Sequence, residues 1–252
     1  MIEKLTYEDI ETIFLVGFAV VFYFLERLSP KHRDLDVKTF IKEDIAAFVM
    51  LVVGVVVFRL IVRAIYFQID LSNYLYWTAA EDWSFPVKVI LAHLISDFLL
   101  YWIHRGMHSN KFLWQTHKWH HSAESLYWLS GFRTSLMHIF LYAFPQILVG
   151  FVIFKFTPLE LGIGFGLGAI SNLFTHSNLK LPEWLSLHRI LVTPDFHHPH
   201  HSQLGTQNKN FGNVTTIWDQ LFGTYVDPKK IRKDFKYGLK EKPGRWRMMI
   251  GL

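Results

Sequence analysis

The sequence predicts an all-α integral membrane protein: a bundle of apolar helices with a histidine-rich helical cap at one end. Three observations predict this class. Of the 252 residues, 51% are hydrophobic and 17% aromatic, and the mean hydropathy of +0.19 is high for a water-soluble globule. Long uncharged stretches alternate with charged loops. Five of the 14 histidines fall within residues 104–121, and a second cluster occupies residues 197–201.

The uncharged stretches predict four or five spanning helices. The first is long enough for a bilayer if Glu11, Glu26 and Arg27 reach the two interfaces. The turn at 155–158 is very short, so the last stretch must return antiparallel to the one before it. The expected spans are residues 10–28, residues 45–67, a stretch from Pro86 to the first histidines, residues 134–154 and residues 159–174.

Charge predicts how these helices are oriented. The loop after the first span and the C-terminal tail, residues 227–252, are basic, whereas the N-terminus and residues 68–86 are acidic. With three spans and then a hairpin, both basic segments and all the clustered histidines lie on one side, which the positive-inside rule makes the cytoplasm. We therefore expect a single domain, 1–252, in a bacterial inner membrane or the endoplasmic reticulum.

Composition also excludes several classes of protein. The chain has no cysteine, which rules out disulfides, thiolate-bound zinc, cysteine-held iron-sulfur clusters and thiolate-bound haem. The net charge is +5 and the isoelectric point near 9.3, but the basic residues flank apolar spans and no stacking or groove-binding motif accompanies them. These charges therefore suit membrane phosphates, and we expect no nucleic-acid partner.

The spacing of the histidines predicts a metal site. Residues four apart, or three and four apart, lie on one face of a helix, so their imidazoles can converge. A belt of protonated histidines on a membrane surface would not repeat this spacing twice. The eight residues exceed the four to six ligands of one ion, so two metals are the simplest account. They are His104, His108, His117, His120, His121, His197, His200 and His201.

The identity of the metal is less constrained by spacing. Neutral imidazole suits zinc, iron, copper and nickel, and the Glu-x-x-His pairs of soluble di-iron bundles do not occur in this sequence. A nitrogen-rich site that opens towards a lipid-accessible span favours redox iron and oxidation of an apolar chain. Two alternatives remain open: a membrane di-zinc hydrolase and a non-catalytic metal-binding membrane protein.

Taken together, these motifs resemble the three histidine boxes of the fatty acid hydroxylase and sterol desaturase superfamily. The resemblance covers roughly residues 90–226. Residues 124–135 are closer to the branch that contains alkylglycerol monooxygenase, and residues 210–225 are closer to bacterial sterol-desaturase-like proteins. Many sterol-type members follow an arginine closely with His-Pro-x-Glu, whereas Arg133 is followed by Thr-Ser-Leu-Met-His.

The resemblance implies a membrane-bound non-haem di-iron oxygenase. Such an enzyme uses dioxygen and external electrons to hydroxylate or desaturate a C–H position of a sterol, a fatty acyl chain or an ether lipid. It implies two iron ions, which zinc can replace in a purified protein. No Gly-rich dinucleotide fingerprint is present, so we expect a separate electron donor: a cytochrome, a ferredoxin or a reductase.

The resemblance also extends the set of site residues. It implies His176 as a ninth ligand, and Asn172 stands where related enzymes use a histidine or a water-bridged asparagine. His188 is a further candidate ligand, although the family pattern does not require it. Asp97, Asp195 and Asp219 are candidates to orient the ligands, as carboxylates commonly do around metal-bound imidazoles. For His138 the sequence favours a packing role.

Overall fold

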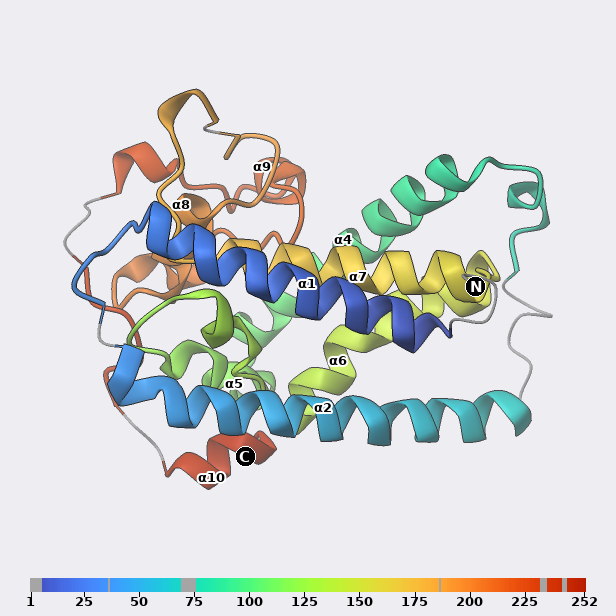
Figure 1. The fold of residues 1–252 in the computed structure, drawn as a ribbon, viewed down its shortest axis with the longest axis horizontal. Coiled ribbons are helices and arrows are strands. Elements are labelled where there is room, and N and C mark those ends of the chain that lie inside the picture. Colours follow the sequence, from blue (N-terminus) through green and yellow to red (C-terminus); the bar gives the residue numbers. More distant parts are fainter. Residues whose placement is uncertain (1–5, 36, 69–75, 186, 232–234, 242–243) are drawn as a thin grey trace.

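The computed structural model describes residues 6–35, 37–68, 76–185, 187–231, 235–241 and 244–252. Among these residues all regular elements are helical, and the β-structure consists of three isolated bridges (Figure 1). The predicted all-α class is therefore confirmed.

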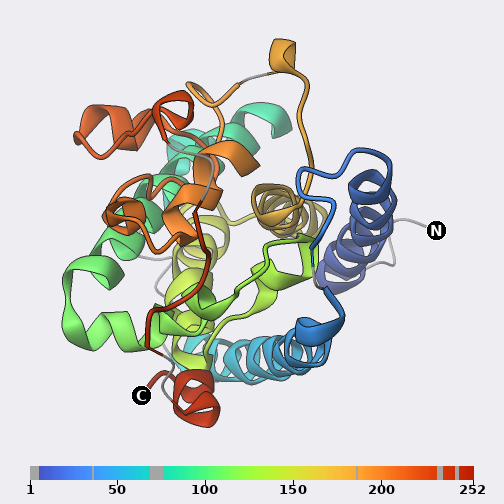
Figure 2. The same ribbon diagram turned by 90° about the vertical axis from the view of Figure 1, so that its left-hand side faces the viewer.

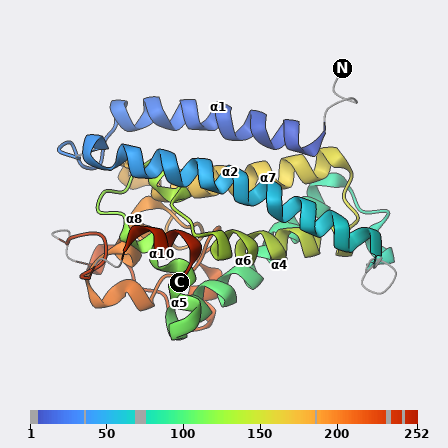
Figure 3. The same cartoon turned by 90° about the horizontal axis from the view of Figure 1, so that it is seen from below.

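Five long helices form the bundle: α1, α2 and α7 lie close to the longest axis of the molecule, and α4 and α6 run obliquely to it (Figures 1 and 3). Helix α1 packs along α7, and α6 contacts both α2 and α4. The bounds of these helices are Tyr7–Leu28 for α1, Val37–Gln68 for α2, Phe85–Ser109 for α4, Leu136–Ile147 for α6, which continues as the π-helix η5 at Leu148–Ile153, and Pro158–His176 for α7.

Three of the helices are long and apolar enough to cross a membrane, within the part of the chain that the structure describes. They are Val37–Val62 in α2, Phe85–Ser109 in α4 and Leu136–Ile153 in α6 and η5. These three coincide with predicted spans. The two other predicted spans correspond to α1 and α7, and their membrane crossing stays a prediction.

The α6–α7 hairpin follows from its sequence. Pro145 has no N–H to donate within α6, and the helix continues past it as the π-helix η5. The chain then turns at Lys155, which adopts a left-handed φ of 46°. Helix α7 begins with a capping box between Thr157 and Glu160, which satisfies amide groups of its first turn. The two helices are therefore antiparallel, as the short turn predicted.

Short helices gather at the end of the bundle where α1, α4 and α7 finish (Figures 1 and 2). We call this part of the molecule the cap. Its elements are α5 at Lys111–Lys118, η3 at His120–Ser122, η4 at Trp128–Phe132, α8 at Pro194–His197, η7 at His198–His201, η8 at Gly205–Asn208, α9 at Ile217–Leu221 and α10 at Arg245–Ile250. The remaining short 3-10 helices are η2 at Thr78–Ala80, η6 at Glu183–Leu185 and η9 at Pro228–Lys230.

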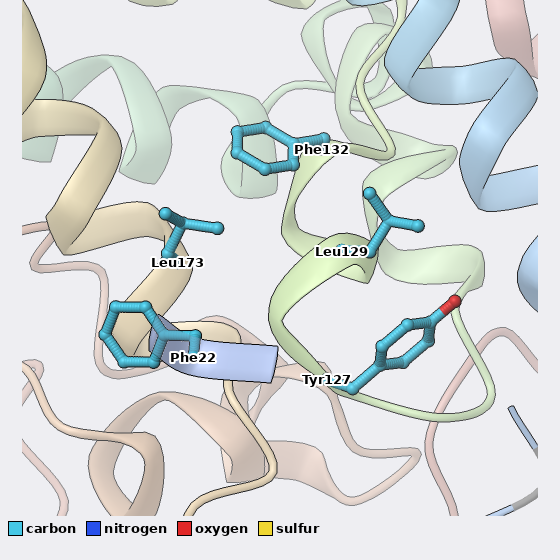
Figure 4. Packing of buried hydrophobic residues seen from close by; sticks show 5 residues of the cluster. All are labelled: Phe22, Tyr127, Leu129, Phe132 and Leu173. Atoms are coloured by element: carbon cyan, nitrogen blue, oxygen red, sulfur yellow. The ribbon is translucent and has the colours of Figure 1, made fainter. Parts of the chain in front are cut away.

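A hydrophobic cluster joins the cap to the bundle (Figure 4). Phe22 of α1 and Leu173 of α7 pack against the η4 segment, which contributes Tyr127, Leu129 and Phe132 to the same cluster. All five side chains are buried. Burying a side chain of this size contributes roughly 1.5–3 kcal/mol, so the cluster fixes η4 against the helices that deliver the candidate site.

Two carboxylates from the first two helices also hold η4. Glu26 of α1 accepts hydrogen bonds from the amide N–H groups of Trp128 and Asn178, each at 2.7 Å. Asp44 of α2 is fully buried; it accepts from the Tyr127 hydroxyl and pairs with the Arg133 guanidinium, which is 2% exposed. These contacts position the backbone of 127–133 beside the histidines.

Candidate metal centre

The structure brings the clustered histidines together in two groups, within each of which the nearest ring nitrogens lie within 4.8 Å of one another. All nine residues named as candidate ligands are in these groups, and all are buried except His108, which is half-buried. The first group is His104, His108, His117, His121 and His200, and the second group is His120, His176, His197 and His201.

Neighbouring histidines divide between the two groups. His104 and His108 come from the last turns of α4, and His117 comes from α5. Helix α5 ends before Trp119, and the chain continues as the 3-10 helix η3, so His120 joins the second group while His121 joins the first. The expectation of one shared helical face is wrong here, because the α-helical turn does not continue past Lys118.

The same division occurs in the last cluster. His197 ends α8, and the 3-10 helix η7 carries the residues that follow. His200 therefore joins the first group, and His201 stays with His197 in the second. His198, between them, belongs to neither group; its Nδ1 lies 3.2 Å from the Tyr237 hydroxyl. Each cluster thus contributes to both groups.

Backbone carbonyls determine which nitrogen of several rings carries the proton. A carbonyl oxygen only accepts, so a neutral imidazole whose Nδ1 faces it is protonated at Nδ1 and has its lone pair at Nε2. His104 Nδ1 donates to Phe211 O and His200 Nδ1 donates to Lys209 O, both at 2.8 Å. His176 Nδ1 donates to the carbonyl of Asn172 at 2.9 Å. His120 Nδ1 donates to Arg133 O at 3.3 Å.

The Nε2 lone pairs of these rings then face one another. His104 Nε2 and His200 Nε2 are 2.9 Å apart in the first group. In the second group His176 Nε2 is 3.1 Å from His120 Nε2. Two lone pairs at this distance repel, and a cation between them removes the repulsion. The donor set therefore fits a metal ion in each group.

Protonation of the rings does not replace such a cation. Burial is the largest cause that lowers the pKa of these histidines, and neighbouring imidazoles lower it further, because each would have to share the space with another positive charge. The rings are thus neutral near pH 7, the form that binds metals. Among the candidate ligands in the cap, the pKa is well below its usual range for His117, His120, His121, His197, His200 and His201.

Two buried aspartates hold the loop that carries the Phe211 carbonyl. Asp219 accepts from the amide N–H groups of Phe211 at 2.8 Å and Gly212 at 2.7 Å. Asp97 of α4 accepts from the amides of Val214 and Thr215 and from the Trp218 indole. Asp97 therefore acts on His104 indirectly: it holds the segment whose Phe211 carbonyl accepts a hydrogen bond from the His104 ring.

The other predicted residues differ in their placement. Asn172 reaches the site through its backbone carbonyl, which accepts from His176. Asp195 is outside both groups; its carboxylate lies 2.7 Å from Lys31 Nζ, with the side chain 52% exposed. His188 also lies outside both groups, and its Nε2 is 3.6 Å from Asp227 Oδ1.

One residue beside the site was not expected there. His138, in the first turn of α6, has its Nδ1 3.1 Å from His117 Nδ1. The two residues are 21 positions apart, and no spacing rule connects a helix-start histidine with a residue on another element. The sequence therefore contained no signal for this contact.

Its apolar spans and two groups of buried imidazoles place this helical protein in the class of membrane proteins with a histidine-rich metal site. Residues 89–224 match the family described as fatty acid hydroxylase. This match covers more than half of the chain, and the protein belongs to that family. The resemblance in the sequence is therefore confirmed.

The names of the similar curated proteins refer to several different lipids. The chain is 34% identical to ornithine lipid hydroxylase OlsE of Rhizobium tropici over 155 residues, which are 60% of this chain and 45% of that protein. It is 30% identical to human alkylglycerol monooxygenase over 173 residues, 63% of this chain and 36% of that enzyme. Rat lathosterol oxidase is 24% identical over 239 residues, 86% of this chain and 74% of that enzyme.

The chain spans less than half the length of the first two of these relatives. No solved structure shows a significant match to it.

Proposed function

We propose that this protein is a membrane-bound non-haem di-iron oxygenase that hydroxylates or desaturates a C–H position of a lipid. The observation that carries the proposal is the pair of imidazole groups at the end of an apolar bundle, with lone pairs directed at one another. The relatives named above support a lipid substrate, because their names refer to an ornithine lipid, an alkylglycerol and a sterol.

The nine grouped histidines would hold the two irons, which would supply the redox chemistry that activates dioxygen. The residues of this chain fix the rings: four backbone carbonyls set the tautomers of His104, His120, His176 and His200. Burial of the rings excludes bulk water from both groups. A site with this many neutral ligands suits electron transfer better than hydrolysis, since neither group contains a carboxylate to act as a base.

A separate electron donor is part of the proposal. Reduction of dioxygen to water takes four electrons, and hydroxylation or desaturation draws two of them from the lipid. The other two must come from a donor such as a cytochrome, a ferredoxin or a reductase. The basic segment 227–252 is a candidate contact for an acidic donor or for anionic lipid.

We further propose that the chain is a single domain with four or five spans: the three identified above, α7, and α1 where five helices cross. The cap then faces the cytoplasm. The basic loop after α1 and the basic tail support this orientation, because both lie at the cap end of the bundle (Figure 1).

The test combines metal analysis with turnover. The purified protein should contain two metal ions per chain and consume dioxygen when it is given electrons and membrane lipid. His120→Ala and His200→Ala, one from each group, should each lose metal and abolish turnover. His93→Ala is the control for metal content, because His93 lies on α4 outside both groups.

Other outcomes would identify the alternatives. Colourless protein with bound zinc and oxygen-independent product would indicate a di-zinc hydrolase. Bound metal without any lipid product would indicate a non-catalytic metal protein. Comparing the lipids of cells with and without the gene would identify the substrate, which the structure leaves as a class.

A further inference from the structure

His138 touches the first histidine group from outside. Its side chain is 3% exposed, and its ring centroid lies 4.9 Å from that of His117. The start of α6 is fixed beside α5: Ser135 Oγ accepts from the His138 amide and donates to the Thr116 carbonyl at 2.6 Å. Tyr142 also packs against the His138 ring, with 4.2 Å between centroids. The position of His138 relative to His117 is therefore well determined.

The contact between the two rings joins Nδ1 to Nδ1 at 3.1 Å, so one nitrogen must donate and the other must accept. If His117 donates, its Nε2 has a free lone pair directed at His121 Nε2, 3.1 Å away in the first group. If His138 donates, His117 is protonated at Nε2 and that lone pair is lost. The two arrangements are mutually exclusive, and only the first lets His117 bind a metal through Nε2.

His117 differs in this respect from four other candidate ligands. The Nδ1 atoms of His104, His120, His176 and His200 face carbonyl oxygens, which can only accept. The acceptor for His117 is instead a side chain that substitution can remove without disturbing the backbone. The function of this contact can therefore be tested directly.

We infer that His138 is a positioning residue for the first metal: its Nδ1 accepts the Nδ1 proton of His117 and thereby directs the Nε2 lone pair of His117 at the ion. The inference rests on the proposed function only in requiring that the first group binds a metal. His138 itself is outside both groups and is not a ligand.

The experiment titrates the purified, metal-stripped protein with Zn²⁺ as the probe. The wild type should bind two ions. His138→Leu removes the acceptor and should lower the Zn²⁺ affinity of one of the two sites by about 10–100-fold, the usual effect of losing a hydrogen-bond partner of a metal-bound histidine. The affinity of the other site should be unchanged. His138→Asn keeps an acceptor at a similar distance from the backbone and should restore most of the affinity. His93→Leu, which replaces an imidazole of the same bundle outside both groups, is the matched control.

Wild-type affinity at both sites in His138→Leu would overturn the inference, and so would His138→Asn behaving like His138→Leu. A second measurement needs no variant at all. In metal-free wild-type protein labelled with ¹⁵N-histidine, His117 should be protonated at Nδ1 and His138 at Nε2. The opposite tautomers would refute the assignment even if the His138→Leu substitution prevented folding. A wild type that binds no Zn²⁺ would instead contradict the proposed function, while the tautomers still decide the role of His138.

Discussion

Gly131 lies where any side chain would strike a candidate ligand. A Cβ at this position would be 2.8 Å from Cγ and Nδ1 of His176, closer than packed atoms approach. Gly131→Ala should therefore rotate the His176 ring away from the Asn172 carbonyl that its Nδ1 contacts. The metal affinity of the second group should fall by about 10–100-fold. Metal content and a Zn²⁺ titration measure this loss.

Gly106 supplies the control for that substitution. It lies on α4 between His104 and His108, yet a Cβ there would meet only Leu113, at an ordinary 3.6 Å. Gly106→Ala should retain both metals. Equal metal loss in the two variants would show that the effect is general destabilisation and not contact with His176.

The buried histidines also make stability depend on pH. Burial lowers the pKa of His197, His200 and His201 well below its usual range, while the unfolded chain titrates near 6.5. Below that pH the unfolded chain binds protons that the folded chain does not. The free energy of unfolding of the metal-free protein should thus fall as pH decreases from about 7 to about 5, with a slope that approaches roughly 1.4 kcal/mol per pH unit for each such ring once the pH is below the unfolded pKa.

Thermal unfolding of metal-stripped protein at a series of pH values checks this dependence. His200→Asn removes one of the titrating rings, so its slope should be shallower than that of the wild type. A stability that stays constant between pH 7 and pH 5 would contradict the buried, neutral state of the rings.

The close packing of α1 on α7 requires a residue without a side chain at position 166 of α7. A Cβ at Gly166 of α7 would lie 2.7–2.9 Å from Phe14 of α1, so Gly166→Ala must push the two helices apart. Overpacking of this kind costs typically about 1–3 kcal/mol. We expect a lower unfolding temperature in detergent.

Gly17 of α1 is the matched control, because a Cβ there would meet nothing within 4 Å. Gly17→Ala replaces a poor helix former by a good one and should leave the unfolding temperature unchanged or raise it, by up to about 1 kcal/mol in free energy. If Gly166→Ala were equally well tolerated, close packing of α1 on α7 would be wrong.

The helices themselves could be predicted from sequence, because length and hydropathy are local properties. Which ring joins which group could not. The α-helix ends between His117 and His120, at Trp119. Trp119 is 3% exposed and packs with Ala47 of α2 and Met248 of α10. These partners are distant in the sequence, so the local spacing predicted a continuous helical face that the tertiary contacts interrupt.

Charged residues in the first two helices were similarly hard to place. The expectation that Glu26 lies at the end of the first span did not identify its partners: its carboxylate accepts from Trp128 and Asn178, which are 102 and 152 positions further along the chain. Only the folded arrangement brings these groups together. The ligand type and the number of groups could be predicted, because the repeated spacing of two imidazole clusters is a local feature of the sequence that does not depend on long-range contacts.

The orientation of the whole molecule can be tested because the chain has no cysteine. Asp82, before α4, and Lys230, in η9, are both exposed. In the proposed topology α4, α6 and α7 cross the membrane between them, so the two residues lie on opposite sides of it. Asp82→Cys and Lys230→Cys each introduce a single thiol. In intact cells a membrane-impermeant maleimide should label the thiol at position 82 and leave that at position 230 unlabelled until the cells are opened.

The cysteine-free wild type is the background control for this labelling. The reverse pattern would place the cap outside the cytoplasm and contradict the orientation. Labelling of both positions in intact cells would contradict an odd number of crossings between them.

The contacts of Glu26 and Asp44 limit how far this protein can be shortened. The family match begins at residue 89, yet the backbone of 127–133, which supplies the Arg133 carbonyl to His120, is held by carboxylates from α1 and α2. A fragment confined to the matched region would lose these carboxylates together with the buried packing of Phe22 against η4. We therefore expect it to hold His120 less firmly than the full chain, so a shortened version of the protein should retain both leading helices.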